Sequence, residues 1–376
     1  MPNVLQTELY YYCYICLLMF NIVITNFFSM KRKLNLVPLA LMLMFFASCE
    51  CARKERVPLD EIDVTIELRR FDKDLFSINT NSIDYEIVRI SQEYPIFFPL
   101  FAEGVIGIGT PEDENFSTYL TSFIEDRMVS ETYKQVQQVF PNTTELNNEL
   151  TNAFKRYRYY FPDKQIPAVY GFVSGFNNSV VLADSVLAVG FDRYLGRDCE
   201  YYSQLGIYKY LQYNMHPQKI PSDLVRAWIF SEYQFNDSID NLVNNMIYEG
   251  SLMYVTKRLL HNHPDSLIFG FTPEQMKWCR NNESHMWAYL VEHKMLFTTD
   301  NFIINQFVSG APFTKGFPPE SPGKAAVWLG YRIVTRFMDR NKDYTLEMLL
   351  NEKDYQSILS RARYNPCLLY TSDAAD

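Results

Sequence analysis

The sequence predicts an α+β fold: a single, mainly helical domain with a small antiparallel β-sheet. Hydrophobic residues make up 48% of the 376 residues and aromatic residues 16%, with only 14 glycines, which indicates a packed core. Apolar residues recur at helical spacing through most of the chain. Runs typical of strands are confined to residues 62–68 and 168–190.

The first half of the predicted domain holds both β-rich regions. Residues 62–68 alternate apolar and polar side chains, as a half-buried strand does, so we expect a strand to open the domain. Residues 82–160 are expected to form a helical layer. Residues 168–190 contain three apolar runs joined by turn residues such as Asn177 and Asn178, which predicts two or three antiparallel strands.

The second half is predicted to be helical, with helices at 238–260, 272–296 and 321–340. Thr272 is expected to cap its helix, since a proline follows it and Gln275 lies three residues on. The pair Ser321-Pro322 predicts a similar start for the third helix. No linker rich in proline, glycine or serine divides residues 57–366, so we expect one domain there.

The N-terminal region predicts a lipoprotein signal peptide over residues 30–48. A basic triplet begins at Lys31, a short apolar stretch follows, and the small residues Ala47 and Ser48 precede Cys49. We expect a lipid on Cys49 and a lipidated tether over residues 49–56. The alternative is an uncleaved membrane anchor, because residues 10–28 form a second apolar stretch upstream.

Both ends of the chain are expected to carry sequence that is foreign to the fold. Residues 1–29 have no basic start and precede a normal signal peptide at Met30, so we interpret them as a mis-called upstream extension. Residues 367–376 continue no helix or strand pattern and are interpreted as an adaptor-derived tail. These two segments are left out of the fold prediction.

Composition and motifs exclude several functional classes. A net charge of −9 without an extended basic block argues against nucleic acid as a partner. The sequence contains none of the His-Glu-x-x-His, Gly-x-Ser-x-Gly, P-loop or Gly-x-Gly-x-x-Gly motifs. None of the five histidines pairs with another at helical metal-binding spacing, so we expect no metal or cofactor. Cys199 and Cys279 could form a disulfide, but we favour two unbonded small hydrophobic side chains.

Two carboxylates on predicted helices are the candidate site residues. Glu249 and Glu283 lie beside or within apolar stripes, where a carboxylate needs a partner. Lys324, Arg332 and Arg336 follow one edge of the third helix and could neutralise them. One interpretation is a pocket built from Glu249, Glu283 and Arg332. The other, which we favour, is a buried structural ion-pair network.

Several ordered segments resemble the gliding-motility lipoprotein GldB family. The resemblance also includes Arg70-Phe-Asp72, Tyr194-Leu-Gly196 and the closing Tyr364-Asn-Pro366, and thus extends through the domain. It implies a role in gliding motility, with no enzymatic activity attached. The longest of these segments are Met246-Ile-Tyr-Glu-Gly250, Trp278-Cys-Arg-Asn-Asn-Glu283 with Trp287, Ala311-Pro-Phe-Thr, Ser321-Pro-Gly-Lys and Trp328-Leu-Gly-Tyr-Arg-Ile-Val334.

A fainter resemblance is to zinc peptidases, in which strands precede a His-Glu-x-x-His helix and a second helix supplies a glutamate. Residues 168–190 followed by Tyr248-Glu249-Gly250 are similar to that order. The corresponding first helix, 224–230, contains no histidine and no general base. The resemblance therefore implies a degenerate zincin-like scaffold without its metal.

From these features we expect a lipid-anchored, non-enzymatic component of gliding motility or of an associated envelope secretion machine. It would face the periplasm, be held to a membrane by its lipid, and act by contacts with envelope proteins of that apparatus. The main alternative is a peptide-binding pseudopeptidase or a cryptic hydrolase that uses Glu249, Glu283 and Arg332. A nutrient-binding lipoprotein is a third alternative, but no linker separates the two lobes that it would need.

Overall fold

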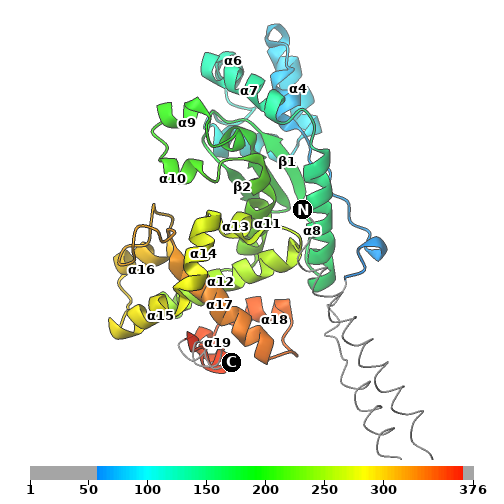
Figure 1. The fold of residues 1–376 in the computed structure, drawn as a ribbon. Coiled ribbons are helices and arrows are strands. Elements are labelled where there is room, and N and C mark those ends of the chain that lie inside the picture. Colours follow the sequence, from blue (N-terminus) through cyan, green and yellow to red (C-terminus); the bar gives the residue numbers. More distant parts are fainter. Residues whose placement is uncertain (1–56, 367–376) are drawn as a thin grey trace, which may run out of the picture. The chain divides into compact units, whose positions relative to one another are not determined.

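The computed structural model describes residues 57–366 (Figure 1). Expectations for the upstream extension, the signal peptide, Cys49 and the C-terminal tail therefore lie outside the described residues. Elements keep the labels of Figure 1. The helices before the sheet are α3 (Phe71–Phe76), α4 (Ile83–Glu93), α5 (Phe97–Pro99), α6 (Phe116–Glu125), α7 (Arg127–Val139) and α8 (Thr144–Tyr160), with a π-helical turn at Leu100–Val105.

Three strands and a long helical half follow. The strands are β1 (Ala168–Phe172), β2 (Val180–Ala183) and β3 (Val186–Gly190). The α+β fold class, mainly helical with one small sheet, is confirmed. The remaining helices are α9 (Glu200–Gln204), α10 (Lys209–Gln212), α11 (Ile220–Glu232), α12 (Leu242–Leu259), α13 (Asp265–Phe269), α14 (Pro273–Asn281), α15 (Glu283–Glu292), α16 (Asn301–Val308), α17 (Ala325–Arg340), α18 (Leu346–Asn351) and α19 (Tyr355–Ala362).

The sheet is mixed, so the prediction of a purely antiparallel sheet was wrong. Its strand order is β1-β3-β2, with β1 parallel to β3 and β2 antiparallel to β3. A tight turn at Asp184 and Ser185 makes β2 and β3 a hairpin, and β1 pairs with the other edge of β3. Apolar runs and turn residues identify strands, but they do not encode which edge a third strand joins.

The sheet separates two hydrophobic clusters. Tyr170 and Phe172 face a cluster formed with the aromatic side chains of α3 and α5, whereas Val169 and Leu187 face the larger cluster of the C-terminal half. Helix α11 packs on β2 and β3. Strand β3 is the middle strand of the sheet and is buried along its whole length, so its side chains contribute alternately to the two clusters.

Residues 62–68 are not a sheet strand, contrary to the prediction. Val64, Ile66 and Leu68 are buried, as their alternation predicts. However, the backbone N–H of Ile66 donates to Thr151 Oγ1 of α8 at 2.9 Å, and that of Leu68 donates to Asn147 Oδ1 at 3.2 Å. Side chains of α8 therefore take the place of a neighbouring strand.

All three predicted helices have different bounds in the structure, and the first of them, α12, begins at Leu242 and not at Ser238. Thr272 caps α14 in a full capping box with Gln275, as predicted, but the helix ends at Asn281 and α15 begins at Glu283. The intervening Asn282 donates from its side chain to the Trp278 carbonyl at 2.9 Å. The third helix begins at Ala325, because Thr314 Oγ1, and not Ser321, accepts the Ala325 N–H at 2.8 Å.

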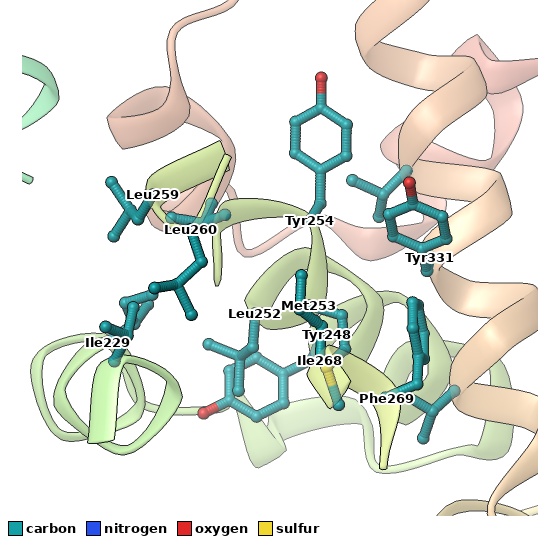
Figure 2. Close-up of a cluster of buried hydrophobic side chains, with 14 of the residues drawn as sticks. Ile229, Tyr248, Leu252, Met253, Tyr254, Leu259, Leu260, Ile268, Phe269 and Tyr331 are labelled. Carbon is teal, nitrogen blue, oxygen red and sulfur yellow. The ribbon is translucent and has the colours of Figure 1, made fainter. Parts of the chain in front are cut away.

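Helices α12 and α17 form the centre of the C-terminal half. Helix α12 is buried along nearly its whole length and is apolar on most sides, which is typical of a central helix. Figure 2 shows side chains of α12, α13 and α17 meeting there, with Tyr331 beside Phe269 at a ring distance of 5.1 Å. The two backbones approach closely at Gly250 and Gly330. A Cβ atom on Gly330 would lie 1.7 Å from the Met246 carbonyl oxygen.

We predict that Gly330→Ala lowers the free energy of unfolding by about 3 kcal/mol, because the added methyl group meets backbone that cannot move aside. Urea unfolding followed by circular dichroism measures this change. The control is Gly310→Ala, where a Cβ atom would meet no atom within 4 Å. Equal stabilities of the two variants would show that the helices can separate without cost.

Candidate functional site

The structure divides the five candidate residues between two clusters. The first, the α11–α12 charge cluster, consists of Lys219, Asp223, Arg226, Glu249 and Lys324. The second, the α15–α17 charge cluster, consists of Glu283, Arg332, Arg336, Asp339 and Tyr364. Arg332 and Glu283 are thus brought together, whereas Glu249 has a different cationic partner.

The α11–α12 charge cluster begins with three charged side chains on one face of α11 and the turn before it. Lys219, Asp223 and Arg226 are spaced four and three residues apart, which places them side by side along a helix. Lys219 forms an ion pair with Asp223 and donates to Ser222 Oγ at 2.9 Å. The Tyr194 hydroxyl also donates to Asp223, at 2.9 Å.

Arg226 connects this face to α12. Its Nη2 atom lies 2.5 Å from Glu249 Oε2, and the two side chains are 31% and 20% exposed. Burial alone would lower the pKa of Arg226, but the carboxylate of Glu249 outweighs that effect and leaves the pKa raised. The guanidinium of Arg226 therefore keeps its proton and its charge.

Lys324 is the least favourably placed member of the cluster. It precedes α17 and is partly buried, and its ammonium group makes no hydrogen bond or ion pair with any residue between 57 and 366. Burial, together with the positive charges of Arg226 and Lys219, lowers the pKa of Lys324 to about 8, and the carboxylates of Glu249 and Asp223 offset this only in part. We expected this lysine to help neutralise a glutamate, but its ammonium group has no ion-pair partner within residues 57–366.

The α15–α17 charge cluster is a closed arrangement around Glu283. This residue begins α15, where a carboxylate interacts favourably with the helix dipole. Arg332 Nε lies 3.0 Å from it, and the Tyr364 hydroxyl donates to it at 2.8 Å. A cavity of about 90 Å³ lies beside these groups and Arg336. That volume is well below the roughly 300 Å³ at which ligand pockets begin.

Asp223 and Arg226 were not among the predicted site residues. The helix that we compared with the peptidase motif was taken to begin at Leu224, one residue after Asp223, and so contained no general base. Ser222, Asp223 and Arg226 have the spacing of the first, second and fifth positions of His-Glu-x-x-His. The spacing of Lys219, Asp223 and Arg226, at four and three residues on the mostly apolar helix α11, could have identified this charged face from the sequence.

The donor chemistry of the α11–α12 charge cluster does not fit a metal ion. Zinc needs deprotonated sulfur, nitrogen or oxygen ligands, and an arginine stays protonated and cannot supply one. Glu249 and Asp223 are each held by a cation of the protein. Within residues 57–366, no three His, Cys, Asp or Glu side chains converge in a group that could hold a metal ion.

The two cysteines of the domain are free thiols. Cys279 is buried in the larger hydrophobic cluster, and burial raises its pKa to about 12, which makes it chemically inert. Cys199 is partly exposed. The interpretation of both as unbonded side chains agrees with the structure, although only Cys279 is a core residue.

The family model described as gliding motility protein GldB matches residues 52–366. The chain belongs to the GldB family. Membership in the GldB family implicates the chain in gliding motility, and both charge clusters lie within the matched residues. No curated protein and no solved structure matches the chain. Among the described residues, no helix is long and apolar enough to cross a membrane.

We predict that stability rises between pH 8 and pH 10 through Lys324. Its pKa of about 8 in the folded protein lies below the value of about 10.4 in the unfolded chain, so the unfolded chain binds more protons in this window. Removing a charge that folding disfavours should make Lys324→Met about 2 kcal/mol more stable than wild type at pH 7. Urea unfolding at several pH values measures both.

The comparison with the variant isolates Lys324 from other groups that titrate in alkali. The stability advantage of Lys324→Met over wild type should shrink as the pH approaches 10. An advantage that is absent at pH 7, or constant across the range, would contradict the depressed pKa of this lysine.

Proposed function

We propose that this GldB family member is a lipid-anchored, non-enzymatic component of the gliding machinery or of an associated envelope secretion machine. It acts by binding other envelope proteins, with its domain facing the periplasm. The observation that carries this proposal is the family membership together with the pairing of each candidate carboxylate. Glu249, Glu283 and Asp223 are all held by cations of the protein itself.

Exposed aromatic side chains support a role in protein contacts. Phe297 and Phe302 lie on either side of the start of α16 and are 60% and 69% exposed, and Tyr208 of the α9–α10 region is 68% exposed. Aromatic residues are enriched at protein interfaces because they bury a large area with few rotatable bonds. These positions are candidate contact points for envelope partners.

The alternative is a peptide-binding pseudopeptidase or cryptic hydrolase. Its supporting observation is the face of α11 that carries Asp223 and Arg226 at the spacing of the peptidase motif, with Arg226 paired to Glu249. A hydrolase would need one of these carboxylates free to accept a proton from water or substrate. In the structure Glu249 is committed to Arg226, and Asp223 is committed to Lys219 and Tyr194.

We predict that Cys49→Ser moves the protein from the membrane fraction to the soluble fraction. The substitution removes the thiol that would carry the lipid, so labelled fatty acid should no longer be incorporated. Fractionation and labelling in a gliding strain measure both effects. Cys51→Ser, two residues further along, is the matched control and should behave as wild type. Membrane retention of Cys49→Ser would favour an anchor in residues 10–28.

A charge exchange separates the structural and the catalytic interpretations of Glu249. In a gliding strain that lacks its own GldB, we predict that Arg226→Glu and Glu249→Arg each reduce protein level and colony spreading, since each leaves two like charges in contact. The combined variant should restore both, because the ion pair reforms in reverse. Immunoblots and spreading assays provide the readouts.

The same experiment can reject the non-enzymatic proposal. If the combined variant accumulates at the wild-type level but colonies still fail to spread, the carboxylate is needed at position 249 itself. That outcome would favour the hydrolase or the peptide-binding alternative.

A further inference from the structure

We propose that the C-terminal end of α8 lies against a membrane with anionic headgroups, the same membrane that carries the lipid of Cys49. This inference rests on the proposed lipid anchor. It deepens that proposal by naming the side of the domain that meets the membrane and the lipid chemistry that this side recognises. The surface, the α8 basic face, consists of Lys155, Arg156, Arg158 and Tyr159.

The length of the chain limits which side of the domain can touch the membrane. Val57, the first described residue, follows Cys49 by eight residues. At about 3.5 Å per residue, Val57 therefore stays within about 28 Å of the lipid at any extension of the chain. A compact domain of about 310 residues is roughly 50 Å across. The side of the domain opposite Val57 cannot reach the membrane, whereas the side that holds Val57 can.

Helix α8 lies beside the point where the chain enters the domain. Val57 leads directly into the 3-10 turn η1 (Leu59–Glu61), and Lys155 Nζ donates to the Leu59 carbonyl at 2.8 Å. Figure 1 shows these first described residues, in blue, next to α8. The last two turns of α8 are therefore on the side of the domain that the anchor holds near the membrane.

The cations of the α8 basic face are not neutralised by carboxylates. Lys155, Arg156 and Arg158 donate only to backbone carbonyl oxygens, at distances between 2.7 and 3.4 Å. The carboxylates of η1 and of Asp163 are near in the chain, but no carboxylate in residues 57–366 forms an ion pair with these three cations. The net charge of the whole chain is −9, so an anionic membrane repels most of the protein. These three positive charges attract it.

Helical spacing places the cations around one exposed aromatic ring. Lys155 and Tyr159 are four residues apart on the outer side of α8, and Arg156 and Arg158 flank them. The opposite side of the helix is buried in the larger hydrophobic cluster. The Tyr159 side chain is 40% exposed. Tyrosine rings accumulate at the level of lipid headgroups, and lysine and arginine beside them attract anionic lipids. The α8 basic face therefore matches the chemistry of a membrane surface.

The test places the full lipidated chain in brominated vesicles of phosphatidylcholine alone, or of an equimolar mixture with phosphatidylglycerol. Tyr159→Trp adds a fluorophore to the α8 basic face and keeps an aromatic ring there. In the mixed vesicles the brominated lipids should quench most of the emission that this substitution adds. High salt should reduce the quenching, because it screens the cations. Tyr208→Trp is the matched control, since Tyr208 is 68% exposed outside this face, and it should not be quenched.

Charge removal tests the role of the cations. In the Tyr159→Trp chain, Lys155→Gln combined with Arg158→Gln should lose most of the quenching in mixed vesicles. Lys134→Gln combined with Lys209→Gln changes the net charge equally at two exposed lysines of α7 and α10, and it should keep the quenching.

A measurement on the wild-type chain does not depend on how the variants fold. Acetylation of lysines, followed by mass spectrometry, should modify Lys155 several-fold more slowly in mixed vesicles than in neutral detergent. Lys209 should react at the same rate in both. Equal rates for Lys155 in the two media would contradict the membrane contact.

Flotation of the vesicles separates this inference from the lipid anchor. Protein that does not float with the vesicles contradicts the anchor and, with it, this inference. Protein that floats, but in which Tyr159→Trp and Tyr208→Trp are quenched equally or not at all, overturns the membrane contact alone and leaves the α8 basic face to a protein partner. Quenching of Tyr159→Trp that is equal in both kinds of vesicle would overturn the assignment to anionic lipids.

Discussion

Helices α12 and α17 cross with their backbones in contact, because Gly250 and Gly330 leave no side chain between them. The rest of the C-terminal half depends on this approach. It sets the position of Glu249 on the turn beside Gly250 and of Arg332 on the turn after Gly330. Any side chain at the crossing would move these two charged groups together.

The charged side chains at the edges of this helix pair are arranged as ion pairs. Glu249 of α12 forms an ion pair with Arg226 of α11, and Glu283 of α15 forms an ion pair with Arg332 of α17. Half-buried ion pairs of this kind add little net stability, but breaking one is costly because an unpaired charge remains. They therefore specify how helices α11, α12, α15 and α17 fit together more than they strengthen the fold.

Periodicity in the sequence was sufficient to predict local structure but not pairing. The helices around Glu249 and Glu283, the Thr272 capping box and the burial of Val64, Ile66 and Leu68 follow from spacing alone. The sheet partner of residues 62–68 did not, because Thr151 and Asn147 of α8 supply the acceptors that a strand was expected to provide. The break at Asn282 depends on one local hydrogen bond, from its side chain to the Trp278 carbonyl. The start of α17 depends on Thr314, which lies eleven residues before Ala325. Glu283 and Arg332 were found because both lie on strongly periodic helices, whereas Arg226 was missed because its helix was judged only by its lack of histidine.

Arg226 determines what this corner of the domain can do. A neutral histidine at the same position could coordinate a metal, but the guanidinium of Arg226 neutralises Glu249 and has no lone pair to offer a metal ion. With Glu249 and Asp223 both neutralised, the charge that remains belongs to Lys324, at the start of α17. Neither carboxylate is then free to accept a proton from water or from a substrate, because each is held by a cation of the protein.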